Sequence, residues 1–161
     1  MRIGILSDIH DNIWALERAL NQLSGCDALF CLGDLCSPFT MLMLGQGFAG
    51  PVHVVWGNND GDKLLLTRQA ERAGNVTLHG EIGELELEDR KIAICHYGQV
   101  ADPLARCGAY DLVCYGHSHR REEKRYGNCL LVNPGEVMGR FGESSCAVYD
   151  SGKHEISILV F

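Results

Sequence analysis

Short apolar runs that end in polar residues recur along this chain. The first covers residues 3–6 and is followed almost at once by Asp8 and His10. A continuous apolar run of this length predicts a strand that is buried on both faces, as in a parallel sheet. In an extended segment, residues two apart point to the same side, so we expect Asp8 and His10 to leave the strand together. The carboxyl edge of such a sheet is where open α/β folds bind ligands.

The next part of the chain alternates helical and strand patterns. The expected helices cover residues 13–23, 39–44 and 62–73, and the expected strands cover residues 28–32 and 53–56. This alternation is typical of βαβ units and a parallel sheet. Both strands end in a glycine and polar side chains, in the motifs Gly33-Asp34 and Gly57-Asn58-Asn59-Asp60. A turn or a helix cap is the alternative explanation for each motif, and we expect Asp60 to cap the following helix.

The second half of the chain favours antiparallel strands. Leucine and glutamate alternate over residues 84–88, which predicts a half-exposed strand in a hairpin with residues 92–95. The other expected elements are a short helix at 102–107, strands at 112–115 and 130–132, a charged strand or turn at 120–125, and a closing hairpin of 146–149 with 156–160. Two of these strands again end in residues that bind metals, namely His96, His117 and His119.

The composition narrows the class of protein. A chain of 161 residues that is 46% hydrophobic and 22% charged predicts one globular domain, residues 1–161, with a substantial core. The formal net charge of −7 argues against a broad basic surface for nucleic acids. A negatively charged ligand would therefore have to be attracted locally, by bound cations.

We expect a cytoplasmic protein without a membrane segment. The chain starts directly in a strand pattern and shows no secretion signal. The longest uncharged stretch, residues 35–59, is interrupted by several glycines and by Pro51, so it does not predict a membrane span. The eight cysteines form no CxxC pair, and most lie in apolar strand patterns, which indicates reduced core thiols.

Together, the strand ends supply seven oxygen or nitrogen donors: Asp8, His10, Asp34, Asn58, His96, His117 and His119. The set contains no thiolate and suits manganese, iron, zinc, nickel or cobalt, and it has too much imidazole for calcium or a lone magnesium. Seven donors are too many for one ion and fit two ions if one carboxylate bridges them. Of the other three histidines, His53 lies within a strand and we expect it to be structural, while His79 and His154 lie in turn or strand-edge contexts without partners and are not assigned to the site.

The order of these motifs resembles the calcineurin-like metallophosphoesterases, whose blocks run DxH, GD, GN, H and GHxH. The corresponding blocks here are Asp8-Ile9-His10, Gly33-Asp34, Gly57-Asn58, His96 and Gly116-His117-Ser118-His119. The small size of the chain is most similar to the compact bacterial and archaeal phosphodiesterase branch of that family. This branch also includes Vps29, a protein scaffold of the retromer complex.

The resemblance implies a fold, a cofactor and a role for each ligand. The implied fold is an α/β sandwich of two mixed β-sheets packed face to face and flanked by helices. The implied cofactor is a pair of divalent transition-metal ions, with manganese as the first choice. Asp8, His10 and His119 would hold the first ion, Asn58, His96 and His117 would hold the second, and Asp34 would bridge them.

The sequence departs from the family pattern at Asn59. Many members carry a histidine at this position, and that histidine is credited with assisting the leaving group. An asparagine can only donate a hydrogen bond there, so we expect leaving groups of low pKa to be favoured. Asn12 and Arg140 are further candidates for contact with a phosphate, although helix capping is the alternative explanation for Asn12.

The expected function is hydrolysis of a small phosphate ester, first a phosphodiester and second a monoester, by in-line attack of a metal-bridging hydroxide. The four positive charges of two divalent ions exceed the two negative charges of Asp8 and Asp34, which explains how an acidic protein could bind a negatively charged substrate. One alternative is a protein-interaction scaffold of the Vps29 type with lapsed catalysis, and another is a protein that stores or senses a single metal ion. Residues 156–161 form an apolar strand that could also pair with a second copy, so a homo-oligomer stays open.

Overall fold

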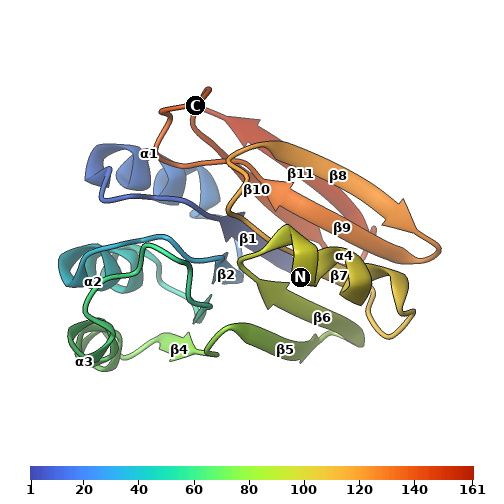
Figure 1. Ribbon diagram of the computed structural model, residues 1–161, viewed down its shortest axis with the longest axis horizontal. Helices are drawn as coiled ribbons and strands as arrows, with labels where there is room; N and C mark the ends of the chain where they lie inside the picture. The colour runs from blue at the N-terminus through green and yellow to red at the C-terminus, as the bar shows by residue number, and fades with distance from the viewer.

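Two β-sheets packed against each other form the centre of the protein. The computed structural model describes residues 1–161. The strands are β1 Arg2–Leu6, β2 Ala28–Cys31, β3 Val52–Val54, β4 Val76–Leu78, β5 Ile82–Leu87, β6 Arg90–Cys95, β7 Leu112–Cys114, β8 Arg121–Tyr126, β9 Cys129–Pro134, β10 Ser145–Asp150 and β11 Glu155–Val160. The helices are α1 Ile13–Leu23, α2 Pro38–Gly47, α3 Lys63–Ala73 and α4 Gly98–Arg106 (Figure 1).

Both sheets are mixed. Sheet A has the order β11-β10-β1-β2-β3-β4; β1 to β4 run parallel, β10 pairs antiparallel with β1, and β11 pairs antiparallel with β10. Sheet B has the order β5-β6-β7-β9-β8; β6, β7 and β9 run parallel, and β5 and β8 are antiparallel edges. The predicted fold class, two mixed sheets face to face with flanking helices, is confirmed.

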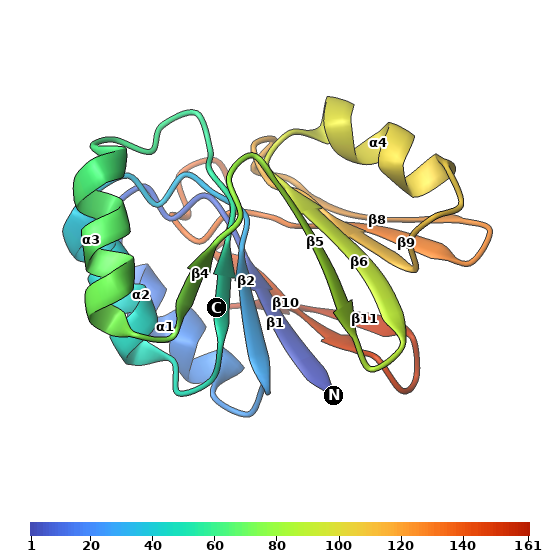
Figure 2. The same ribbon diagram turned by 90° about the horizontal axis from the view of Figure 1, so that it is seen from below.

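The core has three layers because successive strand residues point to opposite faces. In β2, Phe30 faces sheet B, while Leu29 and Cys31 pack with the helices on the other side. In β6, Ile92 and Ile94 join the same inter-sheet layer, whereas the alternate residues pack with α4. Figure 2 shows the result, with α1, α2 and α3 beside sheet A and α4 beside sheet B. Such two-sided burial is the reason that these strands read as continuous apolar runs.

Several local predictions need correction. Helix α4 begins at Gly98, four residues before the expected start, and Pro103 lies inside it. The small side chains of Ala101 and Ala105 let this helix pack closely on sheet B, which outweighs the unfavourable proline. Strand β4 was not expected as a separate element, because its three residues become a strand only by pairing with β3.

The cysteines are all unpaired, and five of them are fully enclosed in the core: Cys31, Cys95, Cys114, Cys129 and Cys146. Burial raises the pKa of the Cys146 thiol to about 12 and that of Cys129 to about 11, so both stay protonated near neutral pH.

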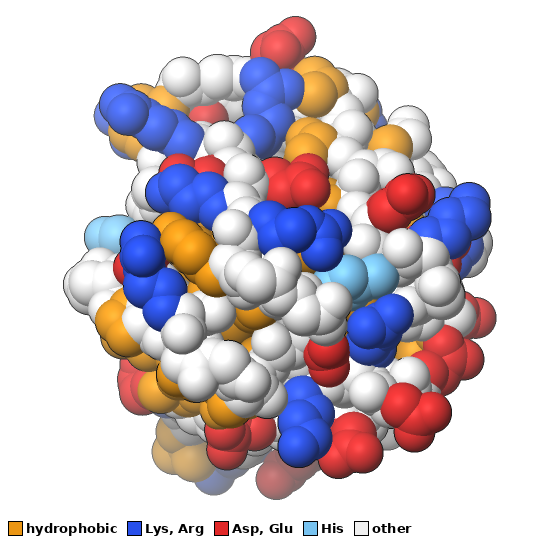
Figure 3. Space-filling view, turned by 90° about the vertical axis from the view of Figure 1, so that its right-hand side faces the viewer, with side chains coloured by type: hydrophobic (Ala, Val, Ile, Leu, Met, Phe, Trp, Pro, Cys, Tyr) orange, Lys and Arg blue, Asp and Glu red, His pale blue; other side chains and the backbone are white.

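None of the four helices has the length and apolar character that crossing a bilayer requires. On the face shown in Figure 3, basic and acidic side chains are interspersed.

Two histidines that we expected to lack partners have them. His79 pairs with His53, with 3.0 Å between Nε2 of His79 and Nδ1 of His53. His154 contacts the Tyr149 hydroxyl through Nδ1 and the Asn128 carbonyl through Nε2, at 2.8 and 2.7 Å. The contacts of His53 with His79 and of His154 with Asn128 each join residues 26 apart in sequence, so the local pattern around each histidine did not indicate them.

The His53–His79 pair predicts a loss of stability in acid. Burial lowers the pKa of both rings below the ordinary value of 6.5, so the unfolded chain binds more protons than the folded one. This contribution to stability is present above pH 6.5 and is lost as the pH falls through the lower folded-state pKa. We expect the urea midpoint of the His79→Gln protein to fall less than that of the unmodified protein between pH 7 and pH 5, with a chelator in both samples. An equal fall in the two proteins would contradict this prediction.

Candidate metal centre

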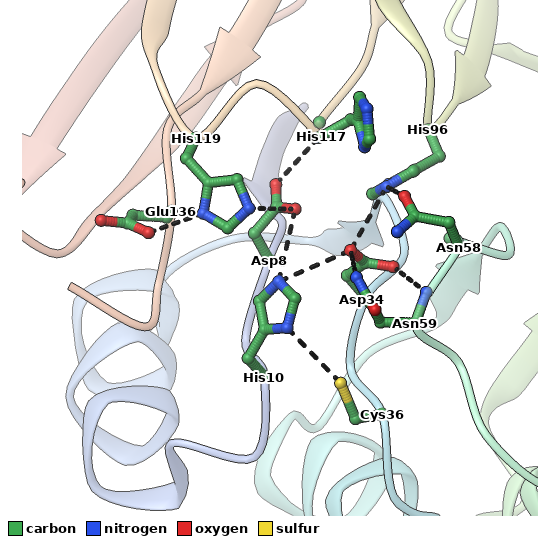
Figure 4. A network of polar contacts seen from close by, with 12 residues as sticks. Asp8, His10, Asp34, Cys36, Asn58, Asn59, His96, His117, His119 and Glu136 are labelled. Carbon is green, nitrogen blue, oxygen red and sulfur yellow. Dashed lines mark hydrogen bonds and ion pairs between the residues drawn. The ribbon is translucent and has the colours of Figure 1, made fainter. Parts of the chain in front are cut away.

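The seven predicted ligands converge at one edge of the sandwich. Each follows the carboxyl end of a strand, in the loops after β1, β2 and β3 of sheet A and after β6 and β7 of sheet B. Figure 4 shows their side chains pointing toward a common centre from both sheets. The parallel arrangement explains this convergence, because the carboxyl ends of neighbouring parallel strands lie at the same edge.

The carboxylates and imidazoles form two groups. Asp8, His10 and His119 place one donor atom each within 4.8 Å of one another, and Asp34, His96 and His117 do the same. The seventh residue, Asn58, lies against the second group, with its Oδ1 atom 3.1 Å from Nε2 of His96. The structure thus brings the seven predicted residues into one site with two candidate ion positions.

Asp34 belongs to the second group and also faces the first. Its Oδ2 atom is 3.5 Å from Nε2 of His10 in the first group and 3.5 Å from Nε2 of His96 in the second. Burial opposes ionisation of Asp34, but hydrogen bonds from His96 and Asn59 outweigh it and hold the pKa of this carboxyl well below its usual range. An ionised Asp34 would therefore be within reach of an ion held by either group.

Unpartnered buried atoms show that the first group fits a cation. The Oδ1 atom of Asp8 and the Nε2 atom of His10 are buried without a hydrogen-bond partner, and they are 3.9 Å apart. The Nε2 atom of His119 is 3.5 Å from the same Asp8 oxygen. Burial raises the pKa of Asp8, which reflects the cost of an uncompensated carboxylate in this place. A divalent ion among these three atoms would supply the missing partner.

Most of the predicted ligands have an unusual backbone conformation. Positive φ angles occur at Asp8 (55°), His10 (44°), Asp34 (55°), His117 (65°) and His119 (58°). We expected Asp8 and His10 to share a side because the chain stays extended; they do converge, but the physical reason is a left-handed turn. Left-handed residues other than glycine cost about 1–2 kcal/mol each, so the surrounding structure must hold them in place. Hydrogen bonds between loops do so, from Asp8 N to Gly33 O at 3.1 Å and from His10 N to Asp34 O at 2.9 Å.

Three acidic residues that the sequence analysis did not assign to the site support the ligand loops. Asp60 was expected to cap α3, but Asp62 caps it, accepting from the Leu65 amide at 3.0 Å. Asp60 instead accepts hydrogen bonds from the amides of Asp34, Leu35, Cys36 and Gly57 at 3.2, 2.9, 3.1 and 2.7 Å. It thereby joins the loop after β2 to the loop after β3.

Asp11 and Glu136 support the first group in the same way. Asp11 accepts from the amide and hydroxyl groups of Ser37 at 2.9 and 2.5 Å, and so joins the loop after β1 to the start of α2. Glu136 is buried, and its Oε2 atom is 2.6 Å from Nδ1 of His119. Asp11 and Asp60 could have been found from the sequence, because each comes just after the residues of a ligand motif. Glu136 follows β9, a strand that carries none of the predicted ligands, so no sequence signal pointed to it.

The three weaker candidates have other contacts. The Asn59 backbone and side-chain amides donate to the two oxygens of Asp34 at 2.7 and 2.8 Å. Asn12 caps α1 by accepting from the Ala15 amide at 3.1 Å and donates to the Met138 carbonyl at 2.9 Å. Arg140 is exposed. For Asn12, the capping explanation describes its contacts.

Known proteins share this architecture. The family model described as the calcineurin-like phosphoesterase superfamily domain matches residues 1–153. Phosphodiesterase MJ0936 of Methanocaldococcus jannaschii is 27% identical over 165 residues, which cover 99% of each chain. Phosphodiesterase YfcE of Escherichia coli is 28% identical over 148 residues, which cover 85% of this chain and 79% of that protein.

Solved structures give the same result for the fold. A structure described as a novel archaeal phosphodiesterase superposes with a TM-score of 0.92 at 27% identity and covers 100% of both chains. Vps29 from Entamoeba histolytica complexed with zinc superposes with a TM-score of 0.71 at 19% identity, over 100% of this chain and 97% of that one. At that identity the likeness to Vps29 concerns the fold alone.

Proposed function

This chain belongs to the calcineurin-like phosphoesterase superfamily, and on this basis we propose that it is a phosphodiesterase that uses two divalent metal ions. The observation that supports this function is the pair of candidate metal-binding groups, with the Asp34 carboxylate of the second group also facing the first. The relatives named as phosphodiesterases, which align with most of the chain, support a diester as substrate.

The ligand types favour particular ions and leave a positive site. Oxygen and imidazole donors without thiolate suit manganese first, and nickel, iron, zinc or cobalt as alternatives. Asp8 and Asp34 bring two negative charges, so two divalent ions leave a local surplus of two positive charges. When bound, the ions would lower the pKa of a coordinated water from 15.7 toward roughly 7 and would neutralise charge on the phosphoryl oxygens.

The residues of the chain orient the site and limit its substrates. Asn59 holds Asp34 through two hydrogen bonds, so its amide group orients a ligand. A carboxamide does not donate a proton to a departing alkoxide, so Asn59 cannot act as a general acid. We therefore infer that esters with leaving groups of low pKa are hydrolysed faster than alkyl esters. The eight unpaired thiols support a reducing compartment such as the cytoplasm.

Purified protein loaded with Mn²⁺ is expected to hydrolyse bis(p-nitrophenyl) phosphate, and to do so faster than p-nitrophenyl phosphate. Chelation should abolish turnover, and returned Mn²⁺ should restore it. Elemental analysis should find two ions per chain. Binding of a single ion without turnover would support the storage or sensor alternative, and two bound ions without turnover of any ester would support the scaffold alternative. Either result would refute the proposed enzyme.

A further inference from the structure

A pocket of about 280 Å³ lies directly beside the metal centre. It is located between the start of β8 and the loop of residues 139–144, and His119 forms part of its wall. The other side chains that matter for its chemistry are Arg120, Arg121, Phe141 and Glu143. His119 therefore belongs both to the candidate metal centre and to the wall of this pocket.

The pocket is attached rigidly to the centre by Glu136. One carboxylate oxygen of Glu136 is 2.6 Å from Nδ1 of His119. The other accepts hydrogen bonds from the amides of Phe141 and Gly142 at 2.5 and 3.0 Å. Figure 4 shows Glu136 behind His119, on the side away from Asp8. Because one buried carboxylate holds both a proposed ligand and the pocket loop, the pocket has a defined position relative to the ions.

The charges in the pocket are not balanced within the protein. Arg121 pairs with Glu143 at 3.5 Å, whereas Arg120 has no carboxylate within ion-pair distance. Arg140 also lacks a carboxylate partner, and its guanidinium lies 5.2 Å from the centre of the Phe141 ring. In a chain with a net charge of −7, unpaired arginines beside the candidate site create a local positive potential.

An exposed aromatic ring completes the pocket. Phe141 is 69% exposed, so its ring is accessible to a bound molecule. Its ring meets His119 edge to face, with centroids 5.1 Å apart. Aromatic faces of this kind stack nucleobases with little preference for the base.

We propose that this pocket binds the part of the ester that stays on phosphorus, with a nucleobase against Phe141 and a second phosphate on Arg120. The substrate class is then a nucleotide phosphodiester that carries a further phosphate. Guanidinium groups bind phosphate oxygens through paired hydrogen bonds, which suits Arg120 to this role. This inference rests on the proposed phosphodiesterase function. It adds the identity of the substrate group that stays on phosphorus, which the metal centre alone does not specify.

Three esters that share the same leaving group, p-nitrophenolate, separate the contribution of the nucleoside from that of the second phosphate. They are methyl p-nitrophenyl phosphate, thymidine 5′-(p-nitrophenyl phosphate) and the same thymidine ester with a 3′-phosphate. In each, water adds to phosphorus, the bond to p-nitrophenolate breaks, and the other ester bond survives. We expect the nucleoside to lower KM and the 3′-phosphate to lower it by about a further tenfold.

Single variants assign each step to a residue. Arg120→Gln should remove the gain from the 3′-phosphate and keep the gain from the nucleoside, and Phe141→Ala should do the reverse. Arg125→Gln is the matched control, since Arg125 is exposed near the far end of β8 and does not line the pocket. All three positions are exposed, so we expect folded proteins, and Arg125→Gln should leave the KM values of all three esters unchanged.

Binding to metal-free protein provides a readout that does not depend on activity. Thymidine 3′,5′-bisphosphate should bind more tightly than thymidine 5′-phosphate by calorimetry, and Arg120→Gln should remove the difference. Equal KM values for the three esters, or a gain that survives Arg120→Gln, would overturn the pocket assignment while leaving the phosphodiesterase in place. Failure to hydrolyse any of the esters, including bis(p-nitrophenyl) phosphate, would instead refute the proposed function.

Discussion

Replacing Asp34 with asparagine is expected to reduce kcat/KM for bis(p-nitrophenyl) phosphate by on the order of a thousandfold or more and to abolish tight binding of both ions. Asp34 Oδ2 is equally distant, at 3.5 Å, from one histidine of each group. A neutral amide there weakens both ion positions at once. The substitution also removes the negative charge between the two positive ions, so the ions repel each other more strongly.

Metal content after dialysis, measured together with kinetics, checks this prediction. Asp62→Asn is the matched control, because it makes the same chemical change at a helix cap that contacts none of the proposed ligands. We expect the control to keep two ions per chain and most of its activity. If the Asp34→Asn protein still holds one ion tightly, Asp34 is not the bridge. The Asp34→Ala protein should behave in the same way, because it also lacks the carboxylate.

The Gly57→Ala substitution is expected to destabilise the fold by about 2 kcal/mol or more and to disrupt the metal centre. A Cβ atom on Gly57 would overlap Oδ1 of Asp34 and the backbone of the same residue. A flexible side chain could move away, but the backbone here is held by Asp60 and by the adjoining Gly33. Relief of the overlap therefore has to displace Asp34.

Urea unfolding of the metal-free protein measures the packing cost, and elemental analysis of the loaded protein measures the loss of the ions. Gly152→Ala is the control, because the nearest atom to its added carbon would be 3.5 Å away, at ordinary contact distance. Stability and metal content equal to those of the control would show that the Gly57 loop accepts a side chain. That result would contradict the rigid placement of Asp34 described above.

These two substitutions test different properties of the centre. Asp34→Asn changes the charge and keeps the size, whereas Gly57→Ala leaves every ligand chemically intact and moves one of them. The supporting carboxylates Asp11, Asp60 and Glu136 explain why such a displacement is costly, since each joins separate segments of the chain. Loops held by such bonds can keep left-handed ligand residues in position, and a fixed position is what a preorganised metal site requires.

The sequence by itself determined the elements that depend on local patterns. Apolar runs predicted β1, β2 and β7, and helical spacing predicted α1 within its observed limits. The polar residues after the runs contained every proposed ligand, because a parallel sheet places all its carboxyl ends at one edge. The pairing of two mixed sheets came from the family resemblance, since alternation of elements alone is compatible with a single sheet.

Only the tertiary structure decided how those ligands are held and what lies beside them. The left-handed turns at Asp8 and His10 replace the extended geometry that we expected, since hydrogen bonds to the next loop enforce them. Asp60 and Asp62 are equally good capping residues in sequence, and the contact of Asp60 with a distant loop separates their roles. Glu136 contacts His119, which lies 17 residues earlier in the chain, and joins it to the loop of residues 139–144. Burial and hydrogen bonding between distant segments arise only when the chain is folded, so no local pattern carries them.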